Sequence, residues 1–162
     1  MGILRAVKRL SEQRSDFELN IIHDLENPAV RHYIQQEHLE DIIHLLGKKS
    51  EEEVARAIQQ CDFMVQFSNY ENQPCVLLEA FCCGKPVVTT PVGGIPEIVN
   101  EHNALIVAPR DEEDLSIKLN EMLDRFTRYS ASNIRQDAVG KYSAEIVGKA
   151  FLQTYRDVMG RR

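Results

Sequence analysis

The chain has 162 residues, of which 43% are hydrophobic and 27% are charged. This composition excludes a wholly disordered chain, and the length suits one domain with its own core. The net charge of −6 argues against a nucleic-acid partner, because proteins that bind a phosphate backbone usually carry the opposite balance. We expect no membrane span and no signal peptide, because no apolar run has the required length.

Strand and helix patterns alternate along the chain. Runs rich in Val and Ile predict strands at residues 17–22, 42–46, 62–67, 86–90 and 104–107. Helices are predicted at 3–10, from Pro28 toward Leu39, from Glu51, from Pro74 to Cys83, and after Asp111 and Ser143. Asn27 provides an N-cap, Ser50 and Glu53 a capping box, and Gly84 a left-handed cap.

The last predicted helix, which begins after Ser143, carries an apolar stripe at helical spacing. We expect this stripe to face the core of the domain. Its members are Ile146, Val147, Ala150, Phe151, Tyr155 and Val158.

The alternation predicts an α/β domain over residues 1–162, with a parallel sheet and helices on both faces. Ligands of such sheets bind at the carboxyl ends of the strands. The loops after Ile22, Leu46, Phe67 and Thr90 are therefore the candidate binding loops.

The four cysteines predict neither a zinc site nor a disulfide framework. Cys82 and Cys83 are adjacent, and no pair has the two-residue spacing that zinc ligands favour. We expect reduced thiols in a cytoplasmic protein, with Cys61 and Cys82 as small buried hydrophobic residues. The histidines are scattered, so no metal ion is expected.

Residues 68–97 carry the candidate chemistry. Pro74 opens a predicted helix, and free amides near residues 73–76 would form an anion site suited to phosphate. Glu71 lies before this helix and Glu79 within it, where carboxylates could accept hydrogen bonds from hydroxyl groups. A sugar linked to a diphosphate would fit both features. The alternative is that Glu71 is a solvated loop residue and Glu79 an exposed helical one.

The spacing of motifs in this stretch resembles a known family. Seven residues separate Glu71 from Glu79, which Ala80 follows; then come Gly84-Lys85-Pro86-Val87 and Gly93-Gly94-Ile95-Pro96-Glu97. This ordered set resembles the carboxyl-terminal domain of retaining glycosyltransferases of the GT-B fold, in particular the family 4 group. The likeness covers nearly the whole chain and implies a Rossmann-like, three-layer domain.

The resemblance implies a role for each site residue. Glu71 would contact donor-sugar hydroxyls as the catalytic residue, and Glu79 would contact the ribose of the nucleotide. The amides of Gln73, Cys75 and Val76 would face the sugar or diphosphate. Gly47 and Lys48 would border the base. Gly93 and Gly94 would form part of the cleft wall, with a plain tight turn that needs glycine as the alternative.

Three features depart from the family pattern. Gln73-Pro74 stands where the family usually has Phe-Gly, and His23-Asp24-Leu25-Glu26 lacks the usual glycine-rich turn. The family's domain opens with a strand bearing an Arg, followed by Lys-Gly. Gly2 matches this glycine, but Met1 stands in place of the Lys. We therefore expect a gap between the strands at 17–22 and 62–67, where that first strand would lie, or a substitute strand from another chain or from the tail.

The implied function is the donor-binding half of an enzyme that transfers a sugar, of the hexose type, to an acceptor hydroxyl. The donor would be a UDP-, GDP- or ADP-sugar, with no separate cofactor, and the partner would be the missing amino-terminal acceptor domain. The isolated chain is expected to be inactive. The alternatives are a non-catalytic nucleotide-sugar-binding or interaction domain and a sugar-nucleotide epimerase-like domain.

Overall fold

The computed structural model describes residues 1–23 and 27–160, so most of the glycine-free turn at 23–26 lies outside the described residues. The helices are α1 (Gly2–Ser11), α2 (Pro28–Gln36), α3 (Glu51–Gln60), α4 (Cys75–Cys82), α5 (Glu112–Arg125), α6 (Ala131–Tyr142) and α7 (Ala144–Met159), with two short 3-10 helices, η1 (Ile95–Glu97) and η2 (Phe126–Arg128). The strands are β1 (Leu19–Ile22), β2 (Ile43–Gly47), β3 (Met64–Gln66), β4 (Val87–Thr89) and β5 (Ala104–Ile106).

The predicted caps set several helix ends. The Asn27 side chain accepts a hydrogen bond from the Ala29 amide at 3.1 Å. Ser50 and Glu53 form the expected reciprocal capping box at the start of α3. Gly84, after α4, has a φ of +74°, the left-handed backbone that glycine adopts without steric cost.

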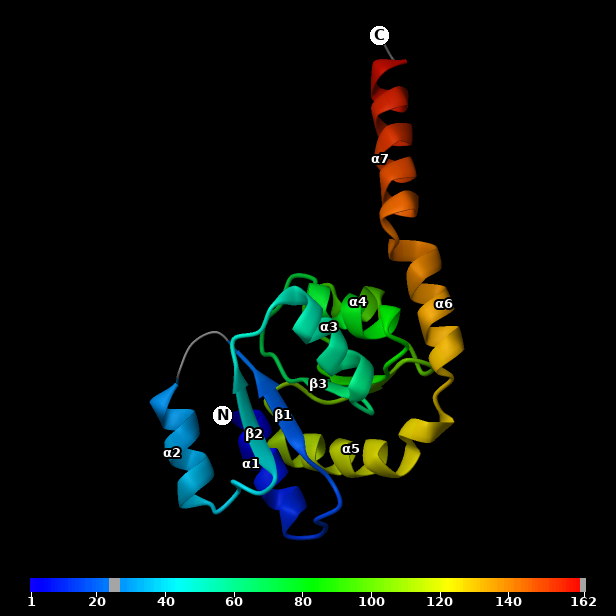
Figure 1. Ribbon diagram of the computed structural model, residues 1–162. Coiled ribbons are helices and arrows are strands. Elements are labelled where there is room, and N and C mark those ends of the chain that lie inside the picture. Colours follow the sequence, from blue (N-terminus) through cyan, green and yellow to red (C-terminus); the bar gives the residue numbers. More distant parts are fainter. Residues whose placement is uncertain (24–26, 161–162) are drawn as a thin grey trace.

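All strand pairs are parallel, as predicted. β2 has the expected length but lies one residue later than predicted, and the other four strands are shorter than their expected ranges. β1 pairs with β2 in one sheet, and β3, β4 and β5 form a second sheet in that order. Parallel strands need a crossover between them, and the intervening helices supply it (Figure 1). The predicted α/β architecture is therefore confirmed.

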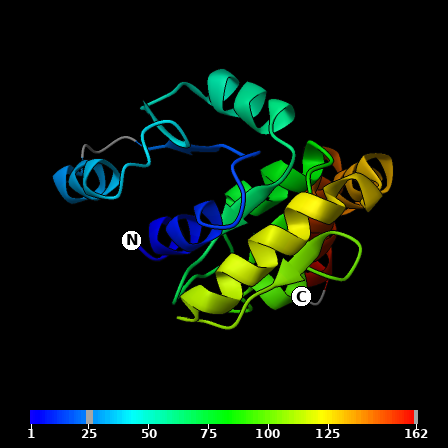
Figure 2. The same cartoon turned by 90° about the horizontal axis from the view of Figure 1, so that it is seen from below.

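The two sheets are separate because no described strand pairs β1 with β3. Residues of both strands line a cavity of about 1890 Å³ between the sheets, and Figure 2 shows the two halves apart on either side of α1. The expected gap is thus confirmed, at the place where the family resemblance predicts a missing strand.

Helices cover both faces of the three-stranded sheet. Val88 points toward α1 and α5, where Leu115 and Leu119 are buried. Val87, the neighbouring residue, points to the opposite face and packs with α4 and α6. This alternation along β4 buries the strand on both sides, as in other parallel sheets.

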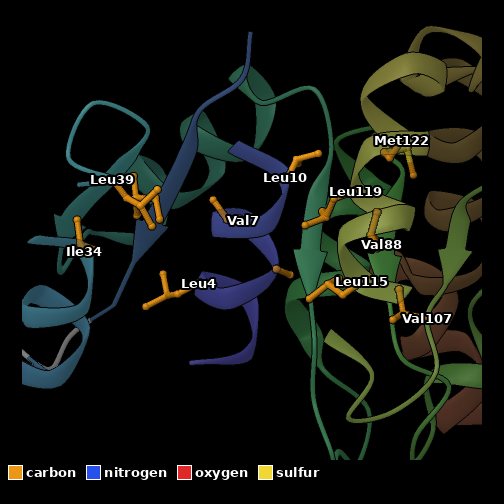
Figure 3. Packing of buried hydrophobic residues seen from close by; sticks show 12 residues of the cluster. Leu4, Val7, Leu10, Ile34, Leu39, Val88, Val107, Leu115, Leu119 and Met122 are labelled. Atoms are coloured by element: carbon orange, nitrogen blue, oxygen red, sulfur yellow. The ribbon is translucent and has the colours of Figure 1, made fainter. Parts of the chain in front are cut away.

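Helix α1 joins the two parts of the fold. Leu4, Val7 and Leu10 lie between Ile34 and Leu39 on one side and the residues of α5 on the other (Figure 3). Arg5 also forms an ion pair with Glu112 at the start of α5. The apolar face predicted for residues 3–10 is therefore the element that connects the two-stranded sheet to the rest of the domain.

The inward orientation predicted for the last helix is wrong. α7 contains no buried residue, and Phe151, Tyr155 and Val158 are each more than 60% exposed. Figure 1 shows α7 extending away from the body of the domain beyond α6. The stripe is real, but the described residues supply no surface for it to cover. No helix among the described residues is long and apolar enough to cross a bilayer.

Candidate functional site

Glu71 lies in the loop that follows β3 at the carboxyl edge of the sheet. Its Oε1 accepts two hydrogen bonds, from Gln66 Nε2 at 2.9 Å and from Ser68 Oγ at 3.0 Å. The side chain is half-buried. A carboxylate held by two donors has a defined orientation, so the reading of Glu71 as a freely solvated loop residue does not fit this structure.

Thr90 connects the loops after β3 and β4. Its buried hydroxyl donates to the Ser68 carbonyl oxygen at 2.7 Å and accepts from the Ser68 amide at 3.3 Å. One hydroxyl thereby satisfies both backbone groups of Ser68. The ends of two adjacent strands are fixed to each other directly beside Glu71.

Gly93 and Gly94 form the turn that packs against the Glu71 loop. A Cβ on Gly93 would lie 1.7 Å from the Glu71 carbonyl oxygen, and Gly93 has a φ of +57°. The Gly94 amide donates to the Asn72 carbonyl oxygen at 2.5 Å. The turn therefore needs glycine, for backbone conformation and for close approach, and it forms one unit with residues 71–73.

The amino terminus of α4 has an unusual cap. The helix begins at Cys75, one residue later than predicted, and Pro74 is its N-cap without a side-chain hydrogen bond. By contrast, Ser50, Asp111 and Ser143 cap α3, α5 and α7 with side-chain oxygens. Proline offers no such oxygen, so its side chain leaves the first-turn amides of α4 uncapped.

The residues flanking Pro74 are accessible. Gln73, Cys75 and Val76 are exposed, and Gln73 packs against Gly94, where an added Cβ would lie 3.3 Å from its own. Four of the predicted site residues, Glu71, Gln73, Gly93 and Gly94, are thus brought together. Contact of these residues with a ligand stays a prediction.

Glu79 is exposed on α4, one turn beyond Val76. No hydrogen bond or ion pair joins it to Glu71 among the described contacts. Its contact with a nucleotide ribose stays a prediction.

Gly47 ends β2, in the separate two-stranded sheet, and Lys48 follows it. Gly47 has a φ of +68°, and its carbonyl oxygen accepts from the His23 amide at 3.3 Å. Lys48 is exposed, while the neighbouring Lys49 pairs with Glu53 at 3.4 Å. A hydrogen bond from the Ser50 amide, with the charge of Lys49, lowers the pKa of Glu53.

The amino terminus of α1 also reaches this region. A Cβ on Gly2 would lie 2.9 Å from two ring carbons of Phe67, the residue that follows β3. Met1, which stands where the family resemblance predicts a lysine, is exposed. The start of α1 therefore packs against the beginning of the loop that carries Glu71.

The described residues contain neither a disulfide nor a cluster of metal ligands. All four cysteines are free thiols, and Cys61 and Cys82 are half-buried rather than fully buried. Partial burial raises the pKa of both thiols. In residues 1–23 and 27–160, no group of three or more His, Cys, Asp or Glu is placed to hold a metal ion.

Sequence reasoning missed three residues of this site: Gln66, Ser68 and Thr90. A signal was present, because Gln66 is a polar residue within the apolar run at 63–67 and lies five residues before Glu71. Its partner could not be identified from spacing. A strand residue and a loop residue five positions apart meet only when the loop folds back over the strand.

A family model and a curated relative match this chain. The model for "Glycosyl transferases group 1" matches residues 2–138. An MMP alpha-(1->4)-mannosyltransferase from Mycolicibacterium hassiacum is 30% identical over 98% of this chain and 40% of its own length.

Solved structures share the fold. Sucrose-phosphate synthase from Thermosynechococcus elongatus superposes with a TM-score of 0.86 at 22% identity, over 99% of this chain and 43% of that one. Anabaena HepE, solved in complex with UDP-glucose, gives 0.83 at 21% identity, over 96% and 44% of the two chains.

These matches show the fold, the extent of the likeness and the family. The parallel sheets and flanking helices correspond to the Rossmann-like architecture of GT-B glycosyltransferases, and the chain spans less than half the length of the curated relatives it matches. With 137 consecutive residues inside the family model, the chain belongs to the group 1 glycosyl transferases.

Proposed function

We propose that this chain is the carboxyl-terminal, donor-binding half of a retaining glycosyltransferase of the family 4 type. In this proposal, the whole enzyme transfers a sugar of the hexose type from a nucleoside-diphosphate sugar to an acceptor hydroxyl. The acceptor-binding half would correspond to the remaining length of the relatives. The observation that carries the proposal is the oriented carboxylate of Glu71 beside the uncapped amino terminus of α4.

Glu71 would be the catalytic residue, in contact with hydroxyl groups of the donor sugar. One of its oxygens is held by protein donors, which supports a fixed acceptor for a ligand hydroxyl on the other. Positive charge grows on a sugar ring as the bond to its leaving group breaks. A fixed carboxylate nearby stabilises that charge without having to reorient.

The leaving diphosphate would be stabilised by the first turn of α4. Amides at a helix amino terminus point toward the ligand, and the helix dipole favours negative charge there. The uncapped amides of Cys75 and Val76, next to Gln73, support this role. Glu79 would bind the ribose, Gly47 and Lys48 would border the base, and the Gly93–Gly94 turn would form the wall behind the sugar.

The donor class follows from the same features. An anion site flanked by carboxylates, which accept hydrogen bonds from hydroxyl groups, fits a sugar nucleotide without a resident metal ion or cofactor. HepE, which shares the fold, was solved with UDP-glucose, so UDP-glucose is the first donor to test, followed by GDP- and ADP-sugars.

The test is turnover in a full-length enzyme that contains this chain. We expect Glu71→Ala to lower turnover at least about 10²-fold, the scale seen when a group that stabilises a transition state is removed. Glu40→Ala is the matched control, because Glu40 is exposed and precedes β2, at the end of that strand opposite Gly47. Equal turnover in the Glu71→Ala variant and the wild type would refute the role of Glu71.

A further inference from the structure

The hydrogen bonds at Glu71 are distributed unequally between its two oxygens. Gln66 Nε2 and Ser68 Oγ both donate to Oε1, at 2.9 and 3.0 Å. Among the residues that the structure describes, none donates to Oε2. Two donors on one oxygen fix the carboxylate plane and leave the second oxygen as the available acceptor.

Gln66 makes this contact at a cost to the fold. Its own carbonyl oxygen, Oε1, is buried and has no hydrogen-bond partner in the described part of the chain. A buried acceptor without a partner is destabilising, and native structures contain few of them. An apolar side chain at position 66 would avoid this cost, so the amide contributes through its NH₂ group, which donates to Glu71.

Ser68 is held in place by a different strand. Thr90, fully buried after β4, bonds both the carbonyl oxygen and the amide of Ser68. On the other side of Glu71, the Gly94 amide bonds the Asn72 carbonyl oxygen. The backbone on both sides of Glu71 is thus fixed from the β4 loop, and small movements of Ser68 are restricted.

We propose that Gln66 and Ser68 are positioning residues that hold Glu71 Oε1, so that Oε2 alone is presented to a hydroxyl group of the donor sugar. This inference rests on the proposed function, and it adds two residues to the site. Thr90 supports the arrangement through the Ser68 backbone. The sugar is then recognised through a single, directed acceptor rather than through either oxygen of a rotating carboxylate.

The first experiment tests the contact without any ligand. In amide NMR spectra of this chain, the side-chain NH₂ protons of Gln66 should exchange slowly with solvent, and one should shift downfield. Glu71→Ala should abolish both effects. Side-chain signals of Gln66 that do not change in the Glu71→Ala variant would overturn the proposal.

The second experiment separates positioning from a structural role. We expect Gln66→Leu to leave thermal stability unchanged or higher, because it removes the unpaired buried oxygen. The same variant should raise the Kd for UDP-glucose about 3- to 10-fold, which corresponds to the net free energy of one hydrogen bond. Binding of UDP, which has no donor sugar, should stay within twofold of the wild type. Both ligands are titrated by NMR, because weak binding is expected.

Two further variants test whether Gln66 acts specifically and through Glu71. Gln59→Leu makes the same chemical change at an exposed site on α3 and should alter neither Kd. In a Glu71→Ala background, Gln66→Leu should have no further effect on UDP-glucose binding, because its partner is already absent. A further weakening there would show that Gln66 acts independently of Glu71, and would overturn the proposal.

The outcomes also distinguish this inference from the proposed function. If Glu71→Ala weakens UDP-glucose binding and Gln66→Leu does not, the positioning role fails while the donor site stands. If the wild-type chain binds none of UDP, UDP-glucose, GDP, GDP-mannose, ADP and ADP-glucose, the proposed function fails, and the presentation of Oε2 to a sugar fails with it.

Discussion

Position 93 illustrates how one residue without a side chain shapes the site. The turn after β4 approaches the Glu71 loop so closely that a Cβ at Gly93 would overlap the Glu71 carbonyl oxygen. The positive φ of Gly93 adds strain for any other residue. Access to Glu71 and its backbone position therefore depend on glycine in a neighbouring loop.

We expect Gly93→Ala to lower the free energy of unfolding by about 1–3 kcal/mol, the usual cost of a strained backbone, and to displace the Glu71 loop. Urea unfolding of this chain measures the first effect and amide chemical shifts of residues 68–73 the second. Gly140→Ala is the control. Gly140 lies inside α6 with open space around it, so alanine should stabilise the chain by about 0.5–1 kcal/mol. Unchanged stability of Gly93→Ala would contradict the close approach.

At the scale of elements, an ion cluster holds the chain after α1 against α5. Arg14 donates to Asp16 with two nitrogens, at 2.7 and 2.8 Å, and to Asp124 at 2.8 Å. The hydrogen bonds from Arg14, followed by a backbone hydrogen bond, lower the pKa of Asp16 to about 2, while both carboxylates raise the pKa of Arg14. The turn that leads from α1 to β1 is thereby anchored.

This cluster predicts that the free energy of unfolding decreases at low pH. The pKa of Asp16 is about 2 in the folded chain and near 3.8 when unperturbed. The unfolded state therefore takes up the proton first, and the stabilisation is lost as pH falls from about 4 to 2. Asp16→Asn should remove this part of the pH dependence, measured by urea unfolding at a series of pH values. The same slope in the variant and the wild type would show that Asp16 is not the group responsible.

α7 is an element with little connection to the rest of the fold. None of its residues is buried, and the family model ends at residue 138, before α7 begins. We expect removal of residues 144–162 to change the free energy of unfolding by less than about 1 kcal/mol, because α7 contributes no buried residue to the core. The shortened chain should also self-associate less, since Phe151, Tyr155 and Val158 are gone. Thermal unfolding and light scattering measure both; a large loss of stability would mean that α7 packs on the body in solution.

At the scale of the whole molecule, the chain corresponds to part of its relatives and has a gap between its two sheets. It spans less than half of its relatives, and the gap between β1 and β3 is a cavity of about 1890 Å³ rather than a paired strand. A diphosphate would also bring about two negative charges to a chain of net charge −6. The family resemblance predicts an Arg and a Lys to offset them. Met1 stands in place of that Lys, and no described strand lies between β1 and β3 to bear the Arg.

We therefore expect this chain alone to bind nucleotide sugars weakly and to show no transfer. One helix amino terminus contributes about 0.3–2 kcal/mol. The loss of two charge-assisted contacts, each about 1.5–3 kcal/mol, weakens binding by about 10²- to 10⁴-fold. Calorimetry with UDP- and GDP-sugars and a transfer assay test this. Micromolar binding, or transfer that Glu71→Ala abolishes, would contradict the expectation.

The local pattern of residues determined much of the fold. Three predicted features depend only on residues close in sequence, and the structure has all of them: the alternation of strands and helices, the capping box of Ser50 and Glu53, and the left-handed cap at Gly84. The α/β class and the gap beside β3 also followed, the gap through the family resemblance. A helix over residues 131–142 was not predicted, since α6 has only a weak apolar face, with Ile134 and Ala138 buried.

Tertiary structure alone decided two further points. The spacing of apolar residues in α7 showed that one face of this helix is apolar. Whether that face is buried depends on a partner surface beside it, and sequence spacing carries no information on such a surface. At the site, the sequence placed Glu71 at the end of a strand. The orientation of its carboxylate depends on Gln66 and on Ser68, which Thr90 fixes from 22 residues away. Such contacts form only when separate strands are brought side by side, because hydrogen bonds require particular distances and angles in space.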